Sequence, residues 1–464
     1  MSRSIVERSH DNTSVHALNI DFDELAARDP DWATISKCAK EARWLDFQDP
    51  KVVRQLTKSI LKCNFNLSLS LPEDRLCPPV PVRWNYIRWI QDLLDTTSDD
   101  YADRYDSQRD VLGLDIGTGA SAIYPLLGCS TRSLWLMAGT DIDTHSLDYA
   151  RQNVAGNNLE QRVKLIHTIA ESPLIPMAAM GVEELDFVMT NPPFYSSRED
   201  MEESYVGKDA AASAISFAAD NELICPGGDI GFVDRIFNES LMLRTRVQWY
   251  TAMLGKLASL QQIVAKLREH EINNFAVTNL QAGHRTKRWA VAWSFQTWRP
   301  RNDIAAAGDV VNAVRPWPTA QTIAVPLMSA KWAGEKVDAT LKGLAVRWKW
   351  RPLISAGVME ARENVWSRAA RRRQQFGKPW SKGVDVQASA HAKAGGKDED
   401  DEQDKEDDDD EEENEEDEDD GISLTVKVMC KEEEVEIRWL RGLDRLLFES
   451  FCGMLKRALG SRDA

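Results

Sequence analysis

The chain has 464 residues, of which 43% are hydrophobic, and a formal net charge of −17. This length and composition are ordinary for a globular protein with more than one domain, and no apolar run approaches the roughly 18 residues of a membrane helix. The seven cysteines are scattered and form no CxxC pair, which argues against a disulfide framework or a zinc site and favours a reducing compartment.

Most of the net charge comes from one acidic block. Residues 398–420 contain 20 Asp and Glu and one Lys, a net charge of −19 that leaves the rest of the chain at +2. The global charge therefore does not exclude a nucleic-acid partner, because the remaining chain is free to carry basic patches. We expect residues 384–421 to form a disordered acidic linker, since their low-complexity sequence cannot build a core.

The first hundred residues predict a helical extension, residues 1–104. The segment DPKVVRQLTKSILKCNF carries apolar residues at helical spacing and begins with the start signal Asp49-Pro50. A proline-rich extended stretch follows it, and a further helix is predicted from about Trp84.

From residue 111 short apolar runs alternate with helical segments. Strands are predicted for VLGLDIG, SLWLMAGTDID, RVKLIHT, LDFVMTN and GGDIGFVD, and helices for HSLDYARQNVAGNN and DAAASAISFAADNEL. They are followed by VQWYTAML, the helix LASLQQIVAKLREH and the segments NNFAVTNLQ and KRWAVAWSF. This alternation indicates a doubly wound α/β domain over residues 105–300, a parallel sheet covered on both faces with antiparallel strands added at its end.

After Pro300 the pattern is less regular. Residues 310–383 and 422–464 predict a smaller α+β domain that the acidic linker splits, and its last segment is an amphipathic helix. The expected fold class is therefore α/β, a Rossmann-like domain with a helical lead-in and a smaller α+β C-terminal region.

Two of the predicted strands end in a nucleoside-binding pattern. In LDIGTGAS, Gly117 and Gly119 permit a tight turn and close approach of the backbone to a ligand. The next strand ends in GTDID, where an acid can accept both hydroxyls of a ribose. The segment lacks the third glycine of GxGxxG and the Lys of a phosphate-binding loop, which favours S-adenosylmethionine over NAD or ATP.

Another strand ends in two prolines, in the run DFVMTNPPFYSSRED. Asn191 offers a side-chain carbonyl and Pro192 a backbone carbonyl, and two converging acceptors suit an exocyclic NH2 group. When the two protons of the NH2 group are held out of the ring plane, the amine lone pair is free to attack a methylsulfonium. The methylated amine then loses a proton without the help of a general base. The ring of Phe194, or else that of Tyr195, provides a surface on which an unstacked base can stack. A base inside a duplex cannot reach it, so the target base is flipped or single-stranded.

The tetrapeptide Asn191-Pro192-Pro193-Phe194 by itself also fits a rigid turn at the end of a strand. The catalytic interpretation is favoured because the glycine turn, the acid and this tetrapeptide follow one another on successive strand ends. Ligands bind at the carboxyl ends of the strands in open α/β sheets.

On these segments the chain resembles the RNA adenine-N6 methyltransferases of the methyltransferase-like protein 16 group, which modify U6 small nuclear RNA, and their bacterial relatives that act on ribosomal RNA. The resemblance covers about residues 30–300 and includes DFQDPKVVRQLTKSIL, PVPVRWNYIRWIQDLL, WYTAMLGK and GHRTKRWAVAWSF. It implies S-adenosylmethionine-dependent formation of N6-methyladenosine in an ACAGAGA-like stretch of U6 RNA. It also implies that residues 1–104 help to bind RNA, and that the protein works in the nucleus, with the cytoplasm as a second location.

The resemblance assigns cofactor contacts to single residues. Gly117 and Ser121 contact the cofactor, and Asp141 takes its ribose where the family usually has Glu. Arg83 pairs with the methionyl carboxylate, as a bidentate guanidinium can, although an Arg at a helix start is also an ordinary surface residue. A further cofactor contact of the family falls near Glu171-Ser172, where the match does not single out a residue.

The same resemblance assigns the catalytic motif and the RNA contacts. Asn191, Pro192, Pro193 and Phe194 form the catalytic motif, and Asn191 touches the cofactor and the target amine alike. The RNA-binding residues that it implies are Arg285, Lys287 and Arg288.

Three further features concern partners. The triplet Arg371–Arg373 fits phosphate contacts, a nuclear signal or a solvated run of charge equally well. The acidic block is free to contact basic proteins. No metal is expected.

Two alternatives stay open at this point. Motifs of the NPP type also serve methylation of ribosomal adenine-N6, of guanine-N2 and of glutamine amides, because each target presents an NH2 group. A protein of another class would be a non-catalytic RNA-binding assembly factor, and its failure to bind S-adenosylmethionine would reveal it.

Overall fold

The structure is a computed structural model that describes residues 18, 20–42, 49–204, 219–282, 286–367, 370 and 421–460. The chain divides into two compact units, a first unit of residues 1–322 with 437–443 and a second unit of residues 323–436 with 444–464. The acidic block, Arg285 and Arg371–Arg373 lie outside the described residues. The domain boundaries expected at residues 104, 300, 310 and 384 stay predictions.

Four helices precede the first sheet: α1 (Phe22–Arg28), α2 (Pro30–Ala42), α3 (Pro50–Phe65) and α4 (Val80–Asp95). The Asp49-Pro50 start signal is confirmed, because the Asp49 side chain accepts a hydrogen bond from the Lys51 backbone N–H at 2.9 Å. The predicted start of the next helix near Trp84 is wrong, since α4 begins at Val80. Pro81 lies in its first turn, where a missing N–H costs no helical hydrogen bond.

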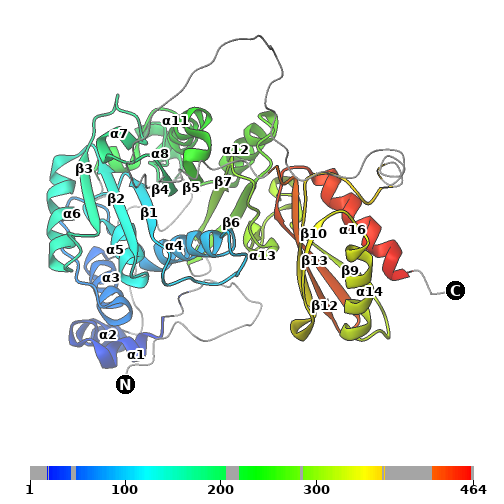
Figure 1. The fold of residues 1–464 in the computed structure, drawn as a ribbon. Coiled ribbons are helices and arrows are strands. Elements are labelled where there is room, and N and C mark those ends of the chain that lie inside the picture. The colour runs from blue at the N-terminus through cyan, green and yellow to red at the C-terminus, as the bar shows by residue number, and fades with distance from the viewer. Residues whose placement is uncertain are drawn as a thin grey trace, which may run out of the picture. The chain divides into compact units, whose positions relative to one another are not determined.

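The first unit is built on a sheet of eight strands (Figure 1). These are β1 (Val111–Ile116), β2 (Trp135–Asp141), β3 (Val163–His167), β4 (Leu185–Thr190), β5 (Val247–Leu254), β6 (Phe275–Ala282), β7 (Thr286–Trp293) and β8 (Ala306–Ala307). Their order is β3-β2-β1-β4-β5-β7-β6-β8; β1 to β5 are parallel, and β7 is antiparallel to β5 and β6. The predicted Rossmann-like fold is confirmed.

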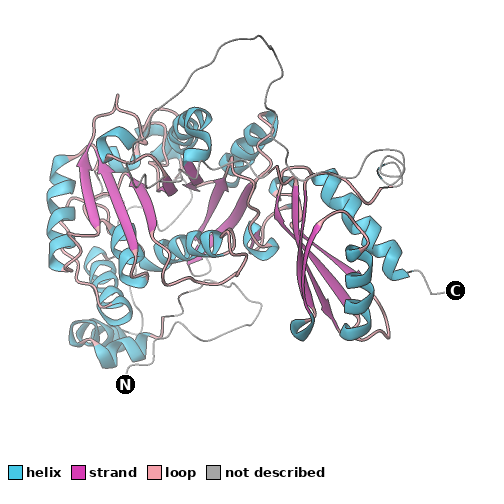
Figure 2. Cartoon of the chain, in the orientation of Figure 1, coloured by secondary structure: helices cyan, strands magenta, loops and turns pink. Residues whose placement is uncertain are grey.

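Helices cover both faces of this sheet (Figure 2). Besides α4 they are α5 (Ile123–Thr131), α6 (Thr144–Gly156), α7 (Met177–Met180), α8 (Arg198–Glu203), α10 (Asp220–Leu223), α11 (Gly228–Leu243), α12 (Leu257–Glu269) and α13 (Asn302–Ala305), with short turns η2 (Arg244–Arg246) and η3 (Asn312–Val314). Strand β5 is buried along its whole length, with Trp249 and Met253 in one core cluster and Tyr250 and Leu254 in the other. It is therefore a central strand.

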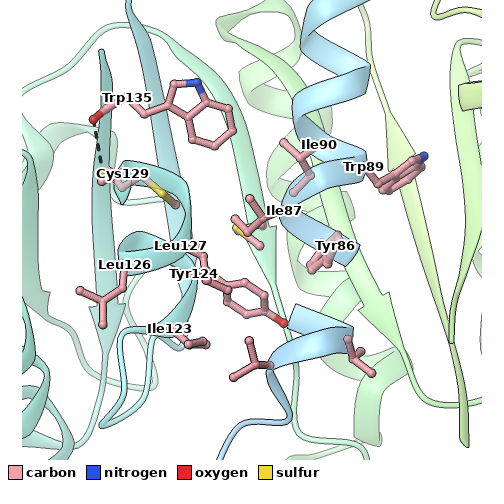
Figure 3. Packing of buried hydrophobic residues seen from close by; sticks show 14 of the residues in the cluster. Tyr86, Ile87, Trp89, Ile90, Ile123, Tyr124, Leu126, Leu127, Cys129 and Trp135 are labelled. Carbon is pink, nitrogen blue, oxygen red and sulfur yellow. Dashed lines mark hydrogen bonds between the residues drawn. The ribbon is translucent and has the colours of Figure 1, made fainter. Parts of the chain in front are cut away.

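Helices α4 and α5 pack beside each other on one face, where Ile87 and Tyr124 lie between them (Figure 3). The rings of Tyr86 and Tyr124 meet edge to face with centroids 5.7 Å apart. The first turns of α4 lie near the carboxyl ends of the strands, where Arg83 reaches Met253 of β5, and the chain just after α4 lies near the start of β5, where Thr97 accepts a hydrogen bond from Gln248.

The strand predicted for GGDIGFVD is wrong, because these residues begin helix α11. The buried residues Val233, Ile236, Phe237 and Ser240 follow a helical period, which continues beyond the eight-residue segment. The Gly227-Gly228 pair, with φ of 76° and 62°, makes the turn into the helix.

The remaining elements are β9 (Ala320–Ala324), α14 (Ala330–Lys342), β10 (Arg347–Arg351), η4 (Pro352–Ile354), β11 (Ala356–Ala361), β12 (Leu424–Lys431), β13 (Glu434–Arg441) and α16 (Arg445–Gly460). The strands form a second sheet in the order β10-β11-β12-β13-β9. Trp348 and Trp350 stack on one another and pack on α14, where a Cβ at Gly334 would lie 2.9 Å from the Trp350 ring. The expected α+β C-terminal region is confirmed. None of the helices that the structure describes is long and apolar enough to span a membrane.

Candidate active site

Three predicted site residues lie side by side at the carboxyl ends of neighbouring strands. Ile116, the last residue of β1, pairs with Thr140 of β2 on one side and with Thr190 of β4 on the other. The next residues along the chain are Gly117, Asp141 and Asn191. Because adjacent strands are about 4.8 Å apart, these three residues leave the same edge of the sheet as direct neighbours.

The glycine turn after β1 is open toward the space at this edge. Gly117 and Gly119 have φ of 74° and 64°, in the left-handed region that glycine adopts without strain. The N–H groups of Gly117 and Thr118 donate to the Thr140 carbonyl at 2.9 and 2.8 Å, which fixes the turn to β2. A Cβ at Gly117 would meet no heavy atom within 4 Å, so the backbone there is accessible to a ligand.

Asp141 is fixed by the turn that it faces. Its Oδ2 accepts a hydrogen bond from the Gly119 N–H at 2.8 Å, and its Oδ1 accepts one from the Asp143 N–H at 2.9 Å. Burial raises the pKa of Asp141, while these backbone hydrogen bonds act to lower it. The carboxylate therefore has a set orientation before any ligand binds.

Arg83 is buried, with 6% of its surface exposed, so the alternative of a surface arginine is wrong. Its Nη1 donates to the Tyr124 hydroxyl at 3.1 Å and lies 3.3 Å from the sulfur of Met253 on β5. Ser121, just before α5, is also buried. Helix α4 thus delivers a cation to the strand ends from a segment far away in sequence.

Asp115 is a site residue that the sequence reasoning missed. It lies on β1, is fully buried, and neither of its carboxyl oxygens has a hydrogen-bond partner among the described residues. Burial raises its pKa to about 7, and the charge of Asp141 adds to this rise. The Thr118 hydroxyl, which is close to the carboxyl group but outside hydrogen-bonding geometry, and the Arg83 charge act to lower the pKa. The signal was an acid inside an otherwise apolar strand, since such a group is retained only where a partner compensates its burial.

The turn after β4 presents an acceptor without a partner. Thr190 ties the strand end to β1, because its hydroxyl donates to the Ile116 carbonyl at 2.9 Å. The Oδ1 atom of Asn191 is buried and has no hydrogen-bond partner among the described residues. Beyond the prolines, Tyr195 exchanges backbone hydrogen bonds of 3.0 Å with Leu223 and Cys225, which holds the far end of the turn.

Phe194 is contacted from two other segments. A Cβ at Gly255, directly after β5, would lie 3.0 Å from the Phe194 ring, so only glycine fits there without a shift. Gly255 is held by Asp229, whose Oδ2 accepts its N–H at 2.8 Å. The guanidinium carbon of Arg288, on β7, lies 4.9 Å from the centroid of the same ring.

The other predicted residues are less tightly placed. Lys287 is exposed, and its Nζ lies 3.9 Å from a carboxyl oxygen of Asp309. Glu171 and Ser172 lie in the loop after β3, where the Ser172 hydroxyl oxygen accepts a hydrogen bond from the Ile169 N–H at 3.4 Å and the Ser172 carbonyl accepts one from Arg235 at 3.3 Å. Within the described residues no group of three or more His, Cys, Asp or Glu is placed to hold a metal.

Comparison with known proteins extends the sequence resemblance to nearly the whole chain. A family model described as RNA methyltransferase matches residues 7–297. The chain is 33% identical over 438 residues to the U6 small nuclear RNA (adenine-(43)-N(6))-methyltransferase of Schizosaccharomyces pombe, a match that covers 93% of this chain and 98% of that protein.

Two further matches each cover 61% of the chain. The RNA N(6)-adenosine-methyltransferase METTL16 of Homo sapiens is 37% identical over 295 residues, 61% of this chain and 50% of that protein. The crystal structure of the hMettl16 catalytic domain with the MAT2A 3′UTR hairpin 1 gives a TM-score of 0.51 at 35% identity and covers 61% of this chain and 96% of that one.

The family model, the 33% identity over 93% of the chain and the shared fold agree with the arrangement of Gly117, Asp141 and Asn191 at neighbouring strand ends. This chain belongs to the RNA methyltransferase family, among the adenine-N6 methyltransferases of the METTL16 and U6 small nuclear RNA group.

Proposed function

We propose that this protein transfers a methyl group from S-adenosylmethionine to N6 of an adenine in U6 small nuclear RNA. The observation that carries the proposal is the buried, unpartnered Oδ1 of Asn191 beside the open glycine turn. The near full-length similarity to the Schizosaccharomyces pombe enzyme supports U6 RNA as the substrate.

On the target side the protein supplies hydrogen-bond acceptors and a stacking surface. In this proposal the Asn191 side chain and the Pro192 carbonyl accept the two N6 hydrogens of a flipped adenine, and Phe194 contacts its ring. The amine lone pair then leaves conjugation with the ring and is free to form the new N–C bond as the donor's S–C bond breaks. The proton that N6 loses goes to solvent, because the methylated cationic amine is strongly acidic.

On the cofactor side the residues fit a ligand that carries a ribose, a carboxylate and an ammonium group. Asp141 would accept the ribose hydroxyls, and Gly117 and Ser121 would contact the cofactor. Arg83 would bind the carboxylate, since its guanidinium is buried at the strand ends. When bound, S-adenosylmethionine supplies the methyl group on a sulfonium.

Asp115 would compensate the ammonium group of the same ligand. Both of its oxygens are buried without a partner in the described chain, which leaves a carboxylate that a cation stabilises. The site therefore offers an anion for the cationic end of the cofactor and a cation for its carboxylate.

The proposed substrate also bears on the location and the partners of the protein. U6 RNA as substrate implies work in the nucleus, and Arg285 and Lys287 are proposed to contact its phosphates. The acidic block at residues 398–420 is proposed to contact basic proteins.

Methyl transfer from labelled S-adenosylmethionine to full-length U6 RNA tests the proposed function. We expect label on N6 of one adenine in an ACAGAGA-like stretch and none when that adenine is replaced by guanine. Ribosomal RNA and a glutamine-containing peptide serve as competing substrates. Label on either of them instead of U6 RNA would overturn the substrate, and failure to bind S-adenosylmethionine would overturn the activity.

A further inference from the structure

The stacking surface of Phe194 is already in use in the structure. The guanidinium carbon of Arg288 lies over the ring, 4.9 Å from its centroid. Stacked aromatic pairs have centroids about 4.5–7 Å apart, so this guanidinium lies where a base stacked on Phe194 would lie. The two groups cannot occupy that place together.

Gly255 lies close to the Phe194 ring from another segment. A Cβ at that position would lie 3.0 Å from the Cδ1 atom of the ring and 3.3 Å from its Cγ atom. Gly255 itself is fixed to α11, because its N–H donates to Asp229, and Asp229 also accepts the Ser259 hydroxyl at 2.9 Å. A base that stacks on the ring at the place of the guanidinium must therefore displace Arg288.

The Arg288 side chain is long and has many rotamers. It lies on β7 and is half-buried, and its Nη1 donates to the Lys287 carbonyl at 3.1 Å. A planar guanidinium stacks on an aromatic ring much as a base does, so the exchange replaces one stacked group by another.

We propose that Arg288 is a positioning residue that covers the stacking face of Phe194 until the target adenine displaces it. The inference rests on the proposed function, in which Phe194 receives a flipped adenine. In the RNA-free protein the guanidinium keeps water and non-target bases from the ring, so a base enters only if its own contacts exceed that interaction.

The test separates the base from the phosphates by a ratio of affinities. Two RNA hairpins are compared, one with an unpaired ACAGAGA stretch and one with an abasic site in place of its target adenine. Binding is measured by fluorescence anisotropy with S-adenosylhomocysteine present, so that no turnover occurs. Contributions from phosphate contacts are common to both RNAs and cancel in the ratio.

In the Arg288→Met variant we expect the adenine to contribute more than in the wild type, because it no longer displaces a guanidinium. The affinity ratio of the two RNAs should rise about two- to tenfold, which is what a partly exposed cation–π contact is worth. Lys287→Met is the matched control, since it removes the same charge one residue away, and it should leave the ratio unchanged.

Each other result contradicts the proposal. An unchanged ratio in Arg288→Met would assign Arg288 to the phosphates alone, and a smaller ratio would make it a clamp on the bound base. If Arg288 affects adenine binding through the Phe194 ring, Arg288→Met in a Phe194→Leu background should not change the affinity ratio.

A second readout needs neither RNA nor activity. With 4-fluorophenylalanine at position 194, the fluorine resonance of the RNA-free protein should shift in Arg288→Met and stay in place in Lys287→Met. An unshifted resonance in Arg288→Met would show that the ring is not covered. If the wild type binds these hairpins but transfers no methyl group to them, the proposed function fails, while the ratio and the resonance still decide the role of Arg288.

Discussion

The two strands that flank β1 end in the same way in sequence and differently in structure. Thr140-Asp141 ends β2, Thr190 ends β4 with Asn191 directly after it, and both threonines pair with Ile116. The Asp141 carboxylate accepts two backbone N–H groups, whereas the buried Oδ1 of Asn191 has no partner in the described chain. A buried acceptor without a partner costs about 1–3 kcal/mol.

This difference separates a group that is oriented in advance from one that awaits its ligand. Backbone N–H groups next to Asp141 donate hydrogen bonds to its carboxylate, so this part of the site is ordered without a ligand. The unpartnered Oδ1 of Asn191 is a cost to folding that an amine donor would remove. The comparison therefore locates the reacting end of the site at β4 rather than at β2.

The largest effect is expected from Asn191→Ala. Removal of an acceptor aimed at the reacting amine should lower kcat by about 10²–10³-fold, the loss typical of a transition-state contact. RNA affinity should stay largely intact, and the melting temperature should not fall, because the Oδ1 atom accepts no hydrogen bond from the described residues. Single-turnover methyl transfer and thermal unfolding measure the two effects.

Asp141→Ala is the matched variant on the other strand. It should lower the melting temperature as well as cofactor affinity, because two backbone donors lose their acceptor. A stable Asp141→Ala protein beside an unstable Asn191→Ala protein would reverse the comparison.

The next effect concerns Asp115 and pH. Burial raises its pKa from an ordinary 3.8 to about 7, so the folded protein binds a proton more tightly than the unfolded one. Its contribution to stability is then present at low pH and is lost as the pH rises toward 7. Asp115→Asn should therefore raise the melting temperature relative to the wild type at pH 8, and raise it by less at pH 5.

Cofactor binding should show the opposite pH dependence. If the ionised Asp115 pairs with the ammonium group, S-adenosylmethionine affinity of the wild type should rise between pH 6 and 8. Asp115→Asn should weaken binding at pH 8 about tenfold, about 1.4 kcal/mol, and flatten the profile. Calorimetry over this range measures both, and a profile that the substitution leaves unchanged would remove Asp115 from the cofactor site.

A smaller effect is expected from Gly255→Ala. The added methyl group would lie 3.0 Å from the Phe194 ring and displace it by a few tenths of an ångström. Turnover should fall several-fold while cofactor affinity is unchanged, because the atoms nearest to the added methyl group belong to Phe194 and Asp229 and not to the residues assigned to the cofactor. Gly453→Ala, in α16 of the second unit, is the control, since its Cβ would meet only the end of the Arg457 side chain, at 3.5 Å. Equal loss in both variants would point to general destabilisation.

The smallest effect is expected from removal of the acidic block. Deletion of residues 398–420 should leave methyl transfer near the wild-type rate, because the proposed catalytic residues all lie before residue 300. The assay is steady-state turnover on U6 RNA at two salt concentrations. An inactive deletion variant would make the block part of the catalytic mechanism.

The sequence by itself determined the elements and the order of the site along the chain. Period-two and period-3.6 patterns are local, so the strands ending at Gly117, Asp141 and Asn191 were predictable, as was the start of α3 at Asp49. The local pattern gave the wrong element where the segment considered was too short to show its period, as in GGDIGFVD, which begins the 16-residue helix α11. It also failed where a proline was taken as extended chain although it lies in the first turn of α4.

Only the tertiary structure decided which distant residues complete the site. Arg83 meets Tyr124 and Met253, which are 41 and 170 positions away, because α4 packs on α5 and crosses to β5. Phe194 meets Gly255 and Arg288 because β4, β5 and β7 are consecutive in the sheet. Such contacts depend on sheet order and helix packing, which no local pattern encodes. The Asp115 carboxylate also lacks a hydrogen-bond partner among the described residues only as a result of the tertiary structure. Whether a buried group has a partner depends on where all the neighbouring segments lie.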